Sequence, residues 1–414
     1  MHIEPPREEW LNRRLKLQQM MKSQGLSGCL VTQNVGIYYY TGSMQTGYLF
    51  VPAVEESTYY VRRSVARALS ESNVKVAELG SFRNFGRQLE ADYPELFGAT
   101  VSEGSLPSSF SSVPLIGTDL DVMPTQLYFR LTEAVPQAKL TDASGLLRQA
   151  RSVKTPYEIA RIERAAEAVA QALDVGCERL HEGMTELELM ATIERELRSH
   201  GHIGLMRMRG YNQEIMTGVV AAGDAAAEPT YFDGPTGGRG LSPAAPQSAS
   251  LRPIGRNEPI LIDIGCCIDG YVIDQTRTAV IGELSPELRA AYETAEAIIR
   301  RAEQELKPGA IPEQIYAEAL MMAEAAGLSS NFMGYGRDQV KFLGHGIGLE
   351  IDEWPVLAKG FRDPLEAGMT IAVEPKFTFP GVGVVGIENT YVITETGCRA
   401  LTVSPEGIYS KQHS

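Results

Sequence analysis

The sequence is poor in cysteine, has no excess of positive charge and contains no apolar run long enough to cross a bilayer. Its five cysteines, an odd number at irregular spacing, argue against a disulfide framework and are typical of a reducing cytoplasm. The adjacent Cys266 and Cys267 are expected to fill the core. The net charge of −14 argues against nucleic acid or an anionic membrane as a partner. The charged start of the chain lacks the apolar core of a signal peptide, so we expect a cytoplasmic protein.

The chain is long enough for two or three domains, and its 414 residues are 43% hydrophobic and 22% charged, as in ordinary globular proteins. Over residues 1–150, short apolar strands alternate with helical patterns, which predicts an α/β domain. We expect a first helix over 7–25, a hairpin within 48–63, and either a strand or a helix start at 36–42. This region contains neither a phosphate-binding glycine loop nor a nucleophile elbow.

The second domain, expected over residues 151–414, repeats one pattern. Two capping boxes, beginning at Thr155 and Thr185, predict helix starts. Two helices followed by a hairpin that bears acids occur at 155–280 and again at 285–395, which indicates a weak internal duplication. We therefore predict an α+β domain with a pseudo-twofold duplication, in which each half offers carboxylates to a shared centre.

In the segment Leu261–Thr278, apolar and polar residues alternate on both sides of Asp269-Gly270, which predicts a β-hairpin with a turn at these two residues. A two-residue turn would place Asp263 opposite Thr276, and Asp274 on the same face, one diagonal step from Asp263. A buried carboxylate without a partner is costly, so each acid needs one. Two acids converging from one hairpin suggest a cation between them. The alternatives are two exposed strand acids, or one acid paired with Arg277.

Glu374 and Glu388 are the acids of a second predicted hairpin, within 369–394. A three-residue loop at 380–382 would place them directly opposite each other. Four acids cannot all ionise near one another without cations. His345 lies among glycines that allow a close approach of the backbone. A lone histidine is more often structural, but four candidate carboxylates favour a metal ligand here.

These motifs resemble those of the pita-bread metallopeptidase superfamily, which contains Xaa-Pro aminopeptidases and dipeptidases, methionine aminopeptidases and creatinase-like non-peptidases. The resemblance covers residues 154–404, and residues 1–150 resemble the creatinase-type N-terminal domain, which goes with the Xaa-Pro branch. The shared motifs are Asp263-x-Gly265, Gly270-Tyr271-x-x-Asp274-x-Thr-Arg-Thr, His345-Gly-Ile-Gly348, Glu374-Pro375 and Glu388. The resemblance implies a pita-bread catalytic domain over 151–414 and a homodimer.

The resemblance also implies two divalent metal ions, with manganese as our first choice and cobalt, iron or zinc as alternatives. Asp263 would bind one ion, His345 and Glu374 would bind the other, and Asp274 and Glu388 would bridge both. A water shared by the two ions would act as a bridging hydroxide. Glu374 would also take the proton of this water and pass it to the leaving amine.

Two departures from the family bear on the substrate. Peptidases of this family place a second histidine seven residues after the ligand histidine, where this chain has Asp352. We predict catalytic roles for Asp352 and its neighbour Glu353, with a preference for a cationic substrate group or a different proton transfer. Trp354 either lines the pocket beside them or packs. The second departure is a missing histidine upstream of the first hairpin, where 224–250 forms either a flexible connector or a substrate lid.

Two arginines are candidates for substrate binding. Arg239, in the predicted lid, is a candidate anion clamp, and Arg207 is a candidate for binding a substrate carboxylate. The alternatives are a flexible connector for the lid and a solvated or structural role for Arg207. Thr276 follows a predicted ligand on the same strand face, so we expect it to orient Asp274.

Three functions follow from the sequence. The first is a dinuclear metal-dependent hydrolase, an Xaa-Pro aminopeptidase or dipeptidase that cleaves short peptides. The second is a metal-dependent non-peptidase on the same scaffold, such as a lyase or an amidinohydrolase-like enzyme, because the two non-ligand histidines are missing. The third is a silent partner-binding protein, which the retention of all five ligand positions disfavours.

Overall fold

The computed structural model describes residues 6–98, 113–215 and 217–412. The chain divides into two compact units, unit 1 within residues 1–150 and unit 2 within residues 151–414. Throughout these described ranges, every helix is too short or too polar to cross a bilayer.

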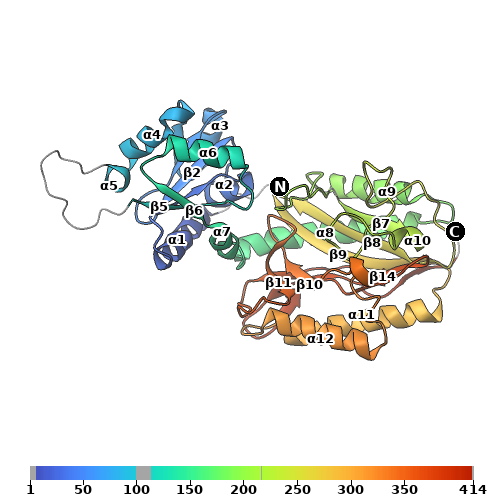
Figure 1. Cartoon of the computed structure of the whole chain (residues 1–414). Helices are drawn as coiled ribbons and strands as arrows, with labels where there is room; N and C mark the ends of the chain where they lie inside the picture. The colour runs from blue at the N-terminus through green and yellow to red at the C-terminus, as the bar shows by residue number, and fades with distance from the viewer. Residues whose placement is uncertain (1–5, 99–112, 216, 413–414) are drawn as a thin grey trace, which may run out of the picture. The chain divides into compact units, whose positions relative to one another are not determined.

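Unit 1 is built on a six-stranded mixed sheet in the order β4-β3-β2-β1-β5-β6. Its strands are β1 (Gly28–Val31), β2 (Gly47–Pro52), β3 (Thr58–Val61), β4 (Lys75–Glu78), β5 (Leu115–Thr118) and β6 (Lys139–Asp142). Its helices are α1 (Arg7–Ser23), α2 (Asn34–Thr41), α3 (Val65–Glu71), η1 (Phe82–Asn84), α4 (Phe85–Asp92), α5 (Pro94–Phe97), α6 (Thr125–Ala134) and α7 (Ser144–Ala150). Figure 1 shows α4 and α6 on one side of this sheet and α1 with α7 on the other. The α/β character predicted for this region is confirmed.

Local sequence signals explain two elements of unit 1. The predicted hairpin is confirmed, because β2 and β3 pair antiparallel with Tyr48 opposite Tyr60. The ambiguous segment 36–42 falls in a helix, α2, and not in a strand. Gly42 ends this helix in the left-handed region, at φ +81°, where its N–H donates to the carbonyl of Tyr38.

Unit 2 contains a five-stranded sheet in the order β11-β10-β12-β15-β16, a four-stranded sheet in the order β17-β9-β8-β7, and the pair β13-β14. Its strands are β7 (Gly218–Ala222), β8 (Ile260–Ile268), β9 (Tyr271–Ile281), β10 (Phe342–Gly346), β11 (Glu353–Ala358), β12 (Thr370–Val373), β13 (Lys376–Phe379), β14 (Gly383–Gly386), β15 (Asn389–Ile393), β16 (Cys398–Ala400) and β17 (Tyr409–Lys411). Its helices are α8 (Pro156–Arg179), α9 (Glu186–Ser199), α10 (Gly223–Ala226), α11 (Pro286–Glu305), α12 (Pro312–Ala325) and η2 (Gly336–Asp338). Figure 1 shows the strands between the pair α8–α9 and the pair α11–α12.

The predicted repeat is visible in the order of elements of unit 2, where each half runs from two long helices into an acid-bearing hairpin. Both predicted capping boxes are present. The side chain of Thr155 accepts from the N–H of Glu158 while Glu158 reaches back, and Thr185 with Glu188 does the same. Each cap satisfies N–H groups that the first helical turn leaves unpaired, which fixes where α8 and α9 begin.

The first hairpin, β8–β9, has the predicted register. Asp263 lies opposite Thr276, and Asp274 lies opposite Gly265, two residues along the same face. Both turn residues have positive φ, 52° at Asp269 and 91° at Gly270. Such a turn twists with the flanking strands and fixes the pairing. The two acids therefore share one face of the hairpin.

The second hairpin also has the predicted register, although it consists of two ladders. In the inner ladder Val373 pairs with Asn389, and in the outer ladder Lys376 pairs with Gly386. The same register runs through both, so Glu374 and Glu388 lie opposite each other in the gap between them.

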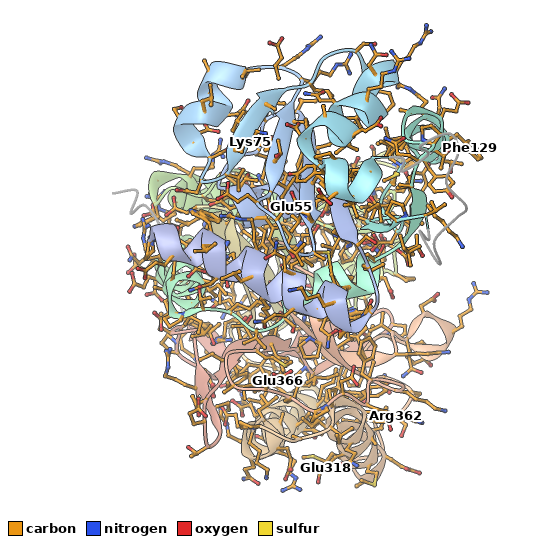
Figure 2. All side chains as sticks on the ribbon, turned by 90° about the vertical axis from the view of Figure 1, so that its left-hand side faces the viewer. Glu55, Lys75, Phe129, Glu318, Arg362 and Glu366 are labelled. Atoms are coloured by element: carbon orange, nitrogen blue, oxygen red, sulfur yellow. The ribbon has the colours of Figure 1, made fainter. Side chains whose placement is uncertain are left out.

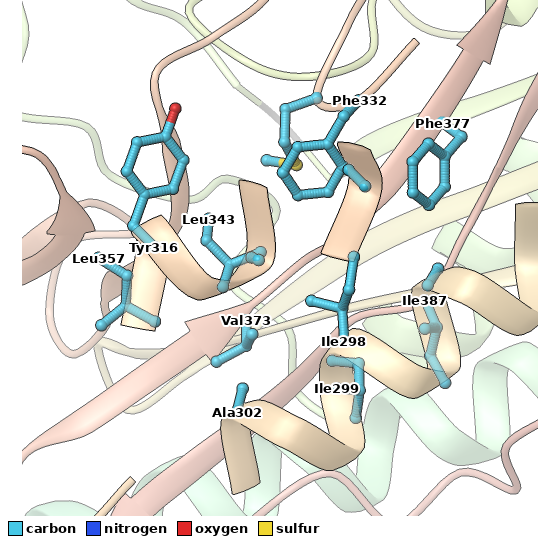
Figure 3. Packing of buried hydrophobic residues seen from close by; sticks show 14 of the residues in the cluster. Ile298, Ile299, Ala302, Tyr316, Phe332, Leu343, Leu357, Val373, Phe377 and Ile387 are labelled. Carbon is cyan, nitrogen blue, oxygen red and sulfur yellow. The ribbon is translucent and has the colours of Figure 1, made fainter. Parts of the chain in front are cut away.

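A hydrophobic core cluster of unit 2 packs against the face of the second hairpin that lies opposite its acids. Ile298, Ile299 and Ala302 of α11 pack around Val373 and Ile387 (Figure 3). Full burial of such an aliphatic side chain stabilises the fold by about 1.5–3 kcal/mol. Because strand residues alternate between faces, Glu374 and Glu388 point away from α11.

Candidate metal centre

Five side chains predicted from the sequence converge in unit 2. They are Asp263 of β8, Asp274 of β9, His345 of β10, Glu374 after β12 and Glu388 before β15. They form two overlapping groups in which one ligand atom per residue lies within 4.8 Å of the others. One group is Asp274, His345 and Glu388, and the other is Asp263, Glu374 and Glu388. Glu388 belongs to both groups.

Backbone hydrogen bonds hold the contributing strands together. The N–H of Glu388 donates to the carbonyl of Thr276 over 3.1 Å, which ties the second hairpin to the first. His345 pairs with Ala372 across β10 and β12. The neighbouring Gly344 makes this approach possible, because a Cβ there would lie 2.1 Å from the carbonyl oxygen of Ala372.

Lys376 lies inside the acid cluster and was not predicted from the sequence. Its ammonium nitrogen is 3.1 Å from Asp263 Oδ2, 2.5 Å from Glu374 Oε2 and 3.1 Å from Glu388 Oε2. Lysines and arginines such as Lys75 and Arg362 lie at the surface (Figure 2), whereas Lys376 has an exposed fraction of 0%. The sequence does contain a signal for this position. Side chains alternate along a strand, so Lys376 is expected on the same face as Glu374, two residues earlier.

Not every carboxylate oxygen of the cluster has a hydrogen-bond donor. Oε1 of Glu388 is buried and has no hydrogen-bond partner among the described residues. Its Oε2 accepts hydrogen bonds from the hydroxyl of Thr276 and from Lys376. The sequence predicts that Thr276 orients Asp274, but in the structure its hydroxyl orients Glu388. Burial, and then Glu388 and Asp263, raise the pKa of Asp274 well above its ordinary value. These groups therefore need a further cation to be stable when ionised.

Arg277 does not supply that cation, which rules out one alternative drawn from the sequence. Its fully buried guanidinium donates five hydrogen bonds. They go to the carbonyls of Pro405, Thr276, Glu388 and Ser404 and to the side-chain oxygen of Asn389. Arg277 thus stabilises the backbone around the cluster, and none of these five hydrogen bonds goes to a carboxylate of the cluster.

The two ring nitrogens of His345 face different groups: Nε2 faces the acid cluster, and Nδ1 faces the carbonyl of Gly346 and the carboxylate of Asp352. Its Nδ1 lies 3.1 Å from the carbonyl of Gly346, which can only accept, so Nδ1 carries the proton. Asp352 Oδ1 is 3.4 Å from the same nitrogen. Its Nε2 faces the acids, 3.5 Å from Glu374 Oε1, and is the ring nitrogen that a metal ion would bind. Burial alone would lower the pKa of His345, but Asp352, Glu374 and Glu388 raise it.

The donor set fits a divalent metal ion. An imidazole nitrogen with several carboxylate oxygens suits manganese, iron, cobalt or zinc. The carbonyl and carboxylate behind Nδ1 of His345 are the supports that metal-bound histidines have. The orphaned Oε1 of Glu388 and the undonated carboxylate of Asp274 supply the oxygens.

A pocket opens onto this cluster. Asp263, Asp274, His345 and Glu374 form its polar floor. Its walls include Phe342, Ile351, Asp352, and the segment 232–236 of the predicted lid. The walls therefore add two carboxylates, Asp233 and Asp352, and none of the described residues that line the pocket is a lysine or arginine.

The other predicted site residues lie apart from these walls. Glu353 is buried, with ion pairs to Arg151 and Lys154. Arg239 pairs with Glu228 and Asp224 at the surface. None of Glu353, Arg239, Arg207 and Trp354 is among the residues that line the pocket.

Arg207 and Trp354 have other neighbours. The carbonyl of Arg207 accepts from the N–H of Ile351. Burial raises the pKa of the Cys267 thiol to about 11, and the nearby guanidinium of Arg207 partly offsets this rise. Trp354 meets the ring of Phe361 edge to face, with centroids 6.3 Å apart. Substrate contacts by Arg207, Arg239 and Trp354 remain predictions.

Comparison with known proteins places the chain in a family. Residues 160–395 match the profile of metallopeptidase family M24, and residues 13–153 match the creatinase/prolidase N-terminal domain. An Xaa-Pro dipeptidase of Pyrococcus furiosus is 28% identical over 389 residues, which is 94% of this chain and 96% of that protein. The solved structure of a dipeptidase from Mycobacterium ulcerans shares the fold, with a TM-score of 0.79 and 24% identity over 99% of both chains. Because the first profile spans more than half of the sequence, this chain belongs to metallopeptidase family M24.

Proposed function

We propose that this chain is a metal-dependent peptidase that cleaves short peptides of the Xaa-Pro type. The observation that carries the proposal is the convergence of four acids and one imidazole in a cluster that opens into a pocket. Xaa-Pro dipeptidases are among the related proteins, which supports the choice of substrate. Asp274, His345 and Glu388 would hold a divalent ion, with Glu374 beside them; manganese is our first choice.

The chemistry divides between the ion and the protein. A divalent ion bound here would polarise the scissile carbonyl and lower the pKa of a water. Glu374 lies at the floor of the pocket, where its carboxylate would take a proton from the attacking water and deliver it to the leaving amine. Asp352 would hold the ring of His345 through Nδ1. The apolar walls at Phe342 and Ile351 would exclude bulk water from the reacting bond.

The charge of the walls supports recognition of a free amino terminus. The carboxylates of Asp233 and Asp352 line the pocket beside the acid floor. A protonated α-amino group would find an oppositely charged environment there. A free substrate carboxylate would need a cation from elsewhere.

A matched panel of peptides tests the proposal. The protein, loaded with Mn²⁺, is incubated with Xaa-Pro dipeptides, Xaa-Pro-Yaa tripeptides and the same peptides with alanine in place of proline. We expect release of the amino-terminal residue from the proline series, lost in Asp274→Asn and His345→Ala and retained in the surface control Glu366→Gln. A protein that binds Mn²⁺ but turns over no peptide in the panel would contradict the proposal.

A second candidate function is favoured by the same acidic walls. Because the pocket is lined by Asp233 and Asp352 and by no described lysine or arginine, it also suits a small cationic molecule that is not a peptide. This function would be a metal-dependent lyase or amidinohydrolase-like activity. Asp352→His and Asp352→Asn separate the two functions. Peptidase activity gained in the histidine variant would favour a peptidase, whereas a reaction of amine or amidine substrates lost in the asparagine variant would favour a non-peptidase.

Location and assembly are proposed from the sequence and the resemblance. All five cysteines are free in the described structure, which supports a reducing cytoplasm. A homodimer is proposed from the family resemblance, and light scattering at several protein concentrations would test it.

A further inference from the structure

The acid cluster of unit 2 already contains one permanent cation. The ammonium of Lys376 has three N–H donors, and three carboxylate oxygens lie within 3.1 Å of its nitrogen, one each from Asp263, Glu374 and Glu388. The side chain has an exposed fraction of 0%, so no water competes for these contacts. Three acidic acceptors match the three donors of one ammonium, so the geometry is that of a lysine cation enclosed by carboxylates.

This ammonium fills one of the two groups of candidate metal ligands. Asp263, Glu374 and Glu388 are the members of that group, and they are the same three acids that contact Lys376. A transition-metal ion bound by these oxygens would have to lie about 2.0–2.2 Å from them, in the space that the ammonium occupies. The lysine and an ion in this position exclude each other.

The backbone is built to place the lysine there. Lys376 is the first residue of β13, directly opposite Gly386 of β14. A Cβ at Gly386 would lie 2.6 Å from Cγ of Lys376 and 2.7 Å from the carbonyl oxygen of Pro375. A residue with a side chain at position 386 would therefore displace the stem of the lysine, and glycine leaves it room.

The second group of ligands keeps its unsatisfied atoms. Asp274, His345 and Glu388 form this group. Oε2 of Glu388 is occupied by Thr276 and Lys376, whereas its buried Oε1 has no partner among the described residues. Asp274 lines the pocket, and no described side chain donates a hydrogen bond to its carboxylate. These atoms would bind a further cation, next to the position that the lysine fills.

We propose that Lys376 replaces one ion of a dinuclear centre, so that each chain binds a single divalent metal ion at Asp274, His345 and Glu388. This inference deepens the proposed metal-dependent function and rests on it. Two divalent ions had been expected from the family resemblance alone. With the lysine, four carboxylates face one monovalent and one divalent cation, and the position nearest Asp263 needs no metal.

Metal stoichiometry tests the inference without relying on activity. The full-length protein is saturated with Mn²⁺, freed of excess ion and analysed for manganese per chain by mass spectrometry. We expect about one ion per chain, and the electron paramagnetic resonance spectrum of a magnetically isolated Mn²⁺. Lys376→Ala vacates the position and should bind about two ions, with spectral signs of exchange coupling between neighbouring ions.

A matched control and the wild-type result keep the test decisive. Lys359→Ala removes an exposed lysine after β11 and should leave the ratio at about one. Two ions in the wild-type protein would overturn the inference, even if Lys376→Ala failed to fold, and would leave the peptidase proposal intact. A folded Lys376→Ala that still binds one ion would also overturn it. Failure of the wild-type and variant proteins to bind any ion would overturn the proposed metal centre as well.

Discussion

Replacing Glu353 by glutamine distinguishes two roles for this residue: stabilising the fold, and the catalytic role predicted from the sequence. Its carboxylate is 5% exposed and is held by Arg151 and by Lys154, at 3.1 Å from the lysine. Oε1 also accepts hydrogen bonds from the N–H groups of Leu349 and Glu350. Glutamine keeps the size of the side chain but removes the charge, so both cations lose one partner.

The size of the effect follows from the pKa. Burial alone would raise the pKa of Glu353, but Arg151 and Lys154 lower it from 4.5 to about 2. At about 1.4 kcal/mol per pKa unit, the ionised carboxylate contributes about 3 kcal/mol to the free energy of unfolding. Because the folded-state pKa is the lower one, this contribution is fully present above about pH 5. It is lost as the pH falls toward 2.

Urea unfolding of the full chain, followed by circular dichroism between pH 7 and pH 4, measures this contribution. We expect Glu353→Gln to lower the free energy of unfolding by about 3–5 kcal/mol at pH 7, because two buried cations lose a partner. The difference should shrink as the pH falls. Glu366→Gln, at an exposed position labelled in Figure 2, is the control and should have little effect. A Glu353→Gln protein with wild-type stability and greatly reduced kcat would refute this reasoning and support the predicted catalytic role.

Three further predictions concern the cluster and its frame. Arg277→Lys keeps the charge but leaves at most three donors for five acceptors, so urea unfolding should show a loss of about 2–6 kcal/mol; a loss below 1 kcal/mol would contradict the role of these bonds. Gly386→Ala should cost about 1–3 kcal/mol, because its Cβ would meet Lys376, and an unchanged melting temperature would argue against this packing. Asp274→Asn removes a buried carboxylate whose pKa is raised mainly by burial, so the metal-free protein should melt at a higher temperature at pH 7 and lose the further rise that Mn²⁺ gives to the wild type. A metal-free variant that melts lower than metal-free wild type would contradict this.

Both acid hairpins could be predicted from sequence because short-range rules determine them. The Asp269-Gly270 pair selects a two-residue turn, and a side-chain period of two then fixes which residues face each other. The same logic held for Glu374 and Glu388, whose spacing across a three-residue loop sets their register. Local chemistry of this kind needs no knowledge of the rest of the fold.

What could not be predicted depends on partners distant in the chain. Glu353 sits next to Asp352, yet one pairs with Arg151 while the other lines the pocket, and no local pattern separates them. The hydroxyl of Thr276 donates to Glu388, an acid of the other hairpin. This contact depends on how the two hairpins pack, which the local sequence does not determine. Lys376 differs from these cases, since a lysine beside an acid in a buried strand was a visible conflict with the expected pattern.

The position of Lys376 has a consequence for how the protein matures. A positive charge that is part of the polypeptide arrives with the chain, at the moment when the hairpins first come together. Repulsion among the acids is thus already reduced before any ion is encountered, so folding need not wait for metal supply. With the single ion proposed above, loading would be a late, single-step equilibrium, whose occupancy follows a simple hyperbola as the concentration of free ion rises.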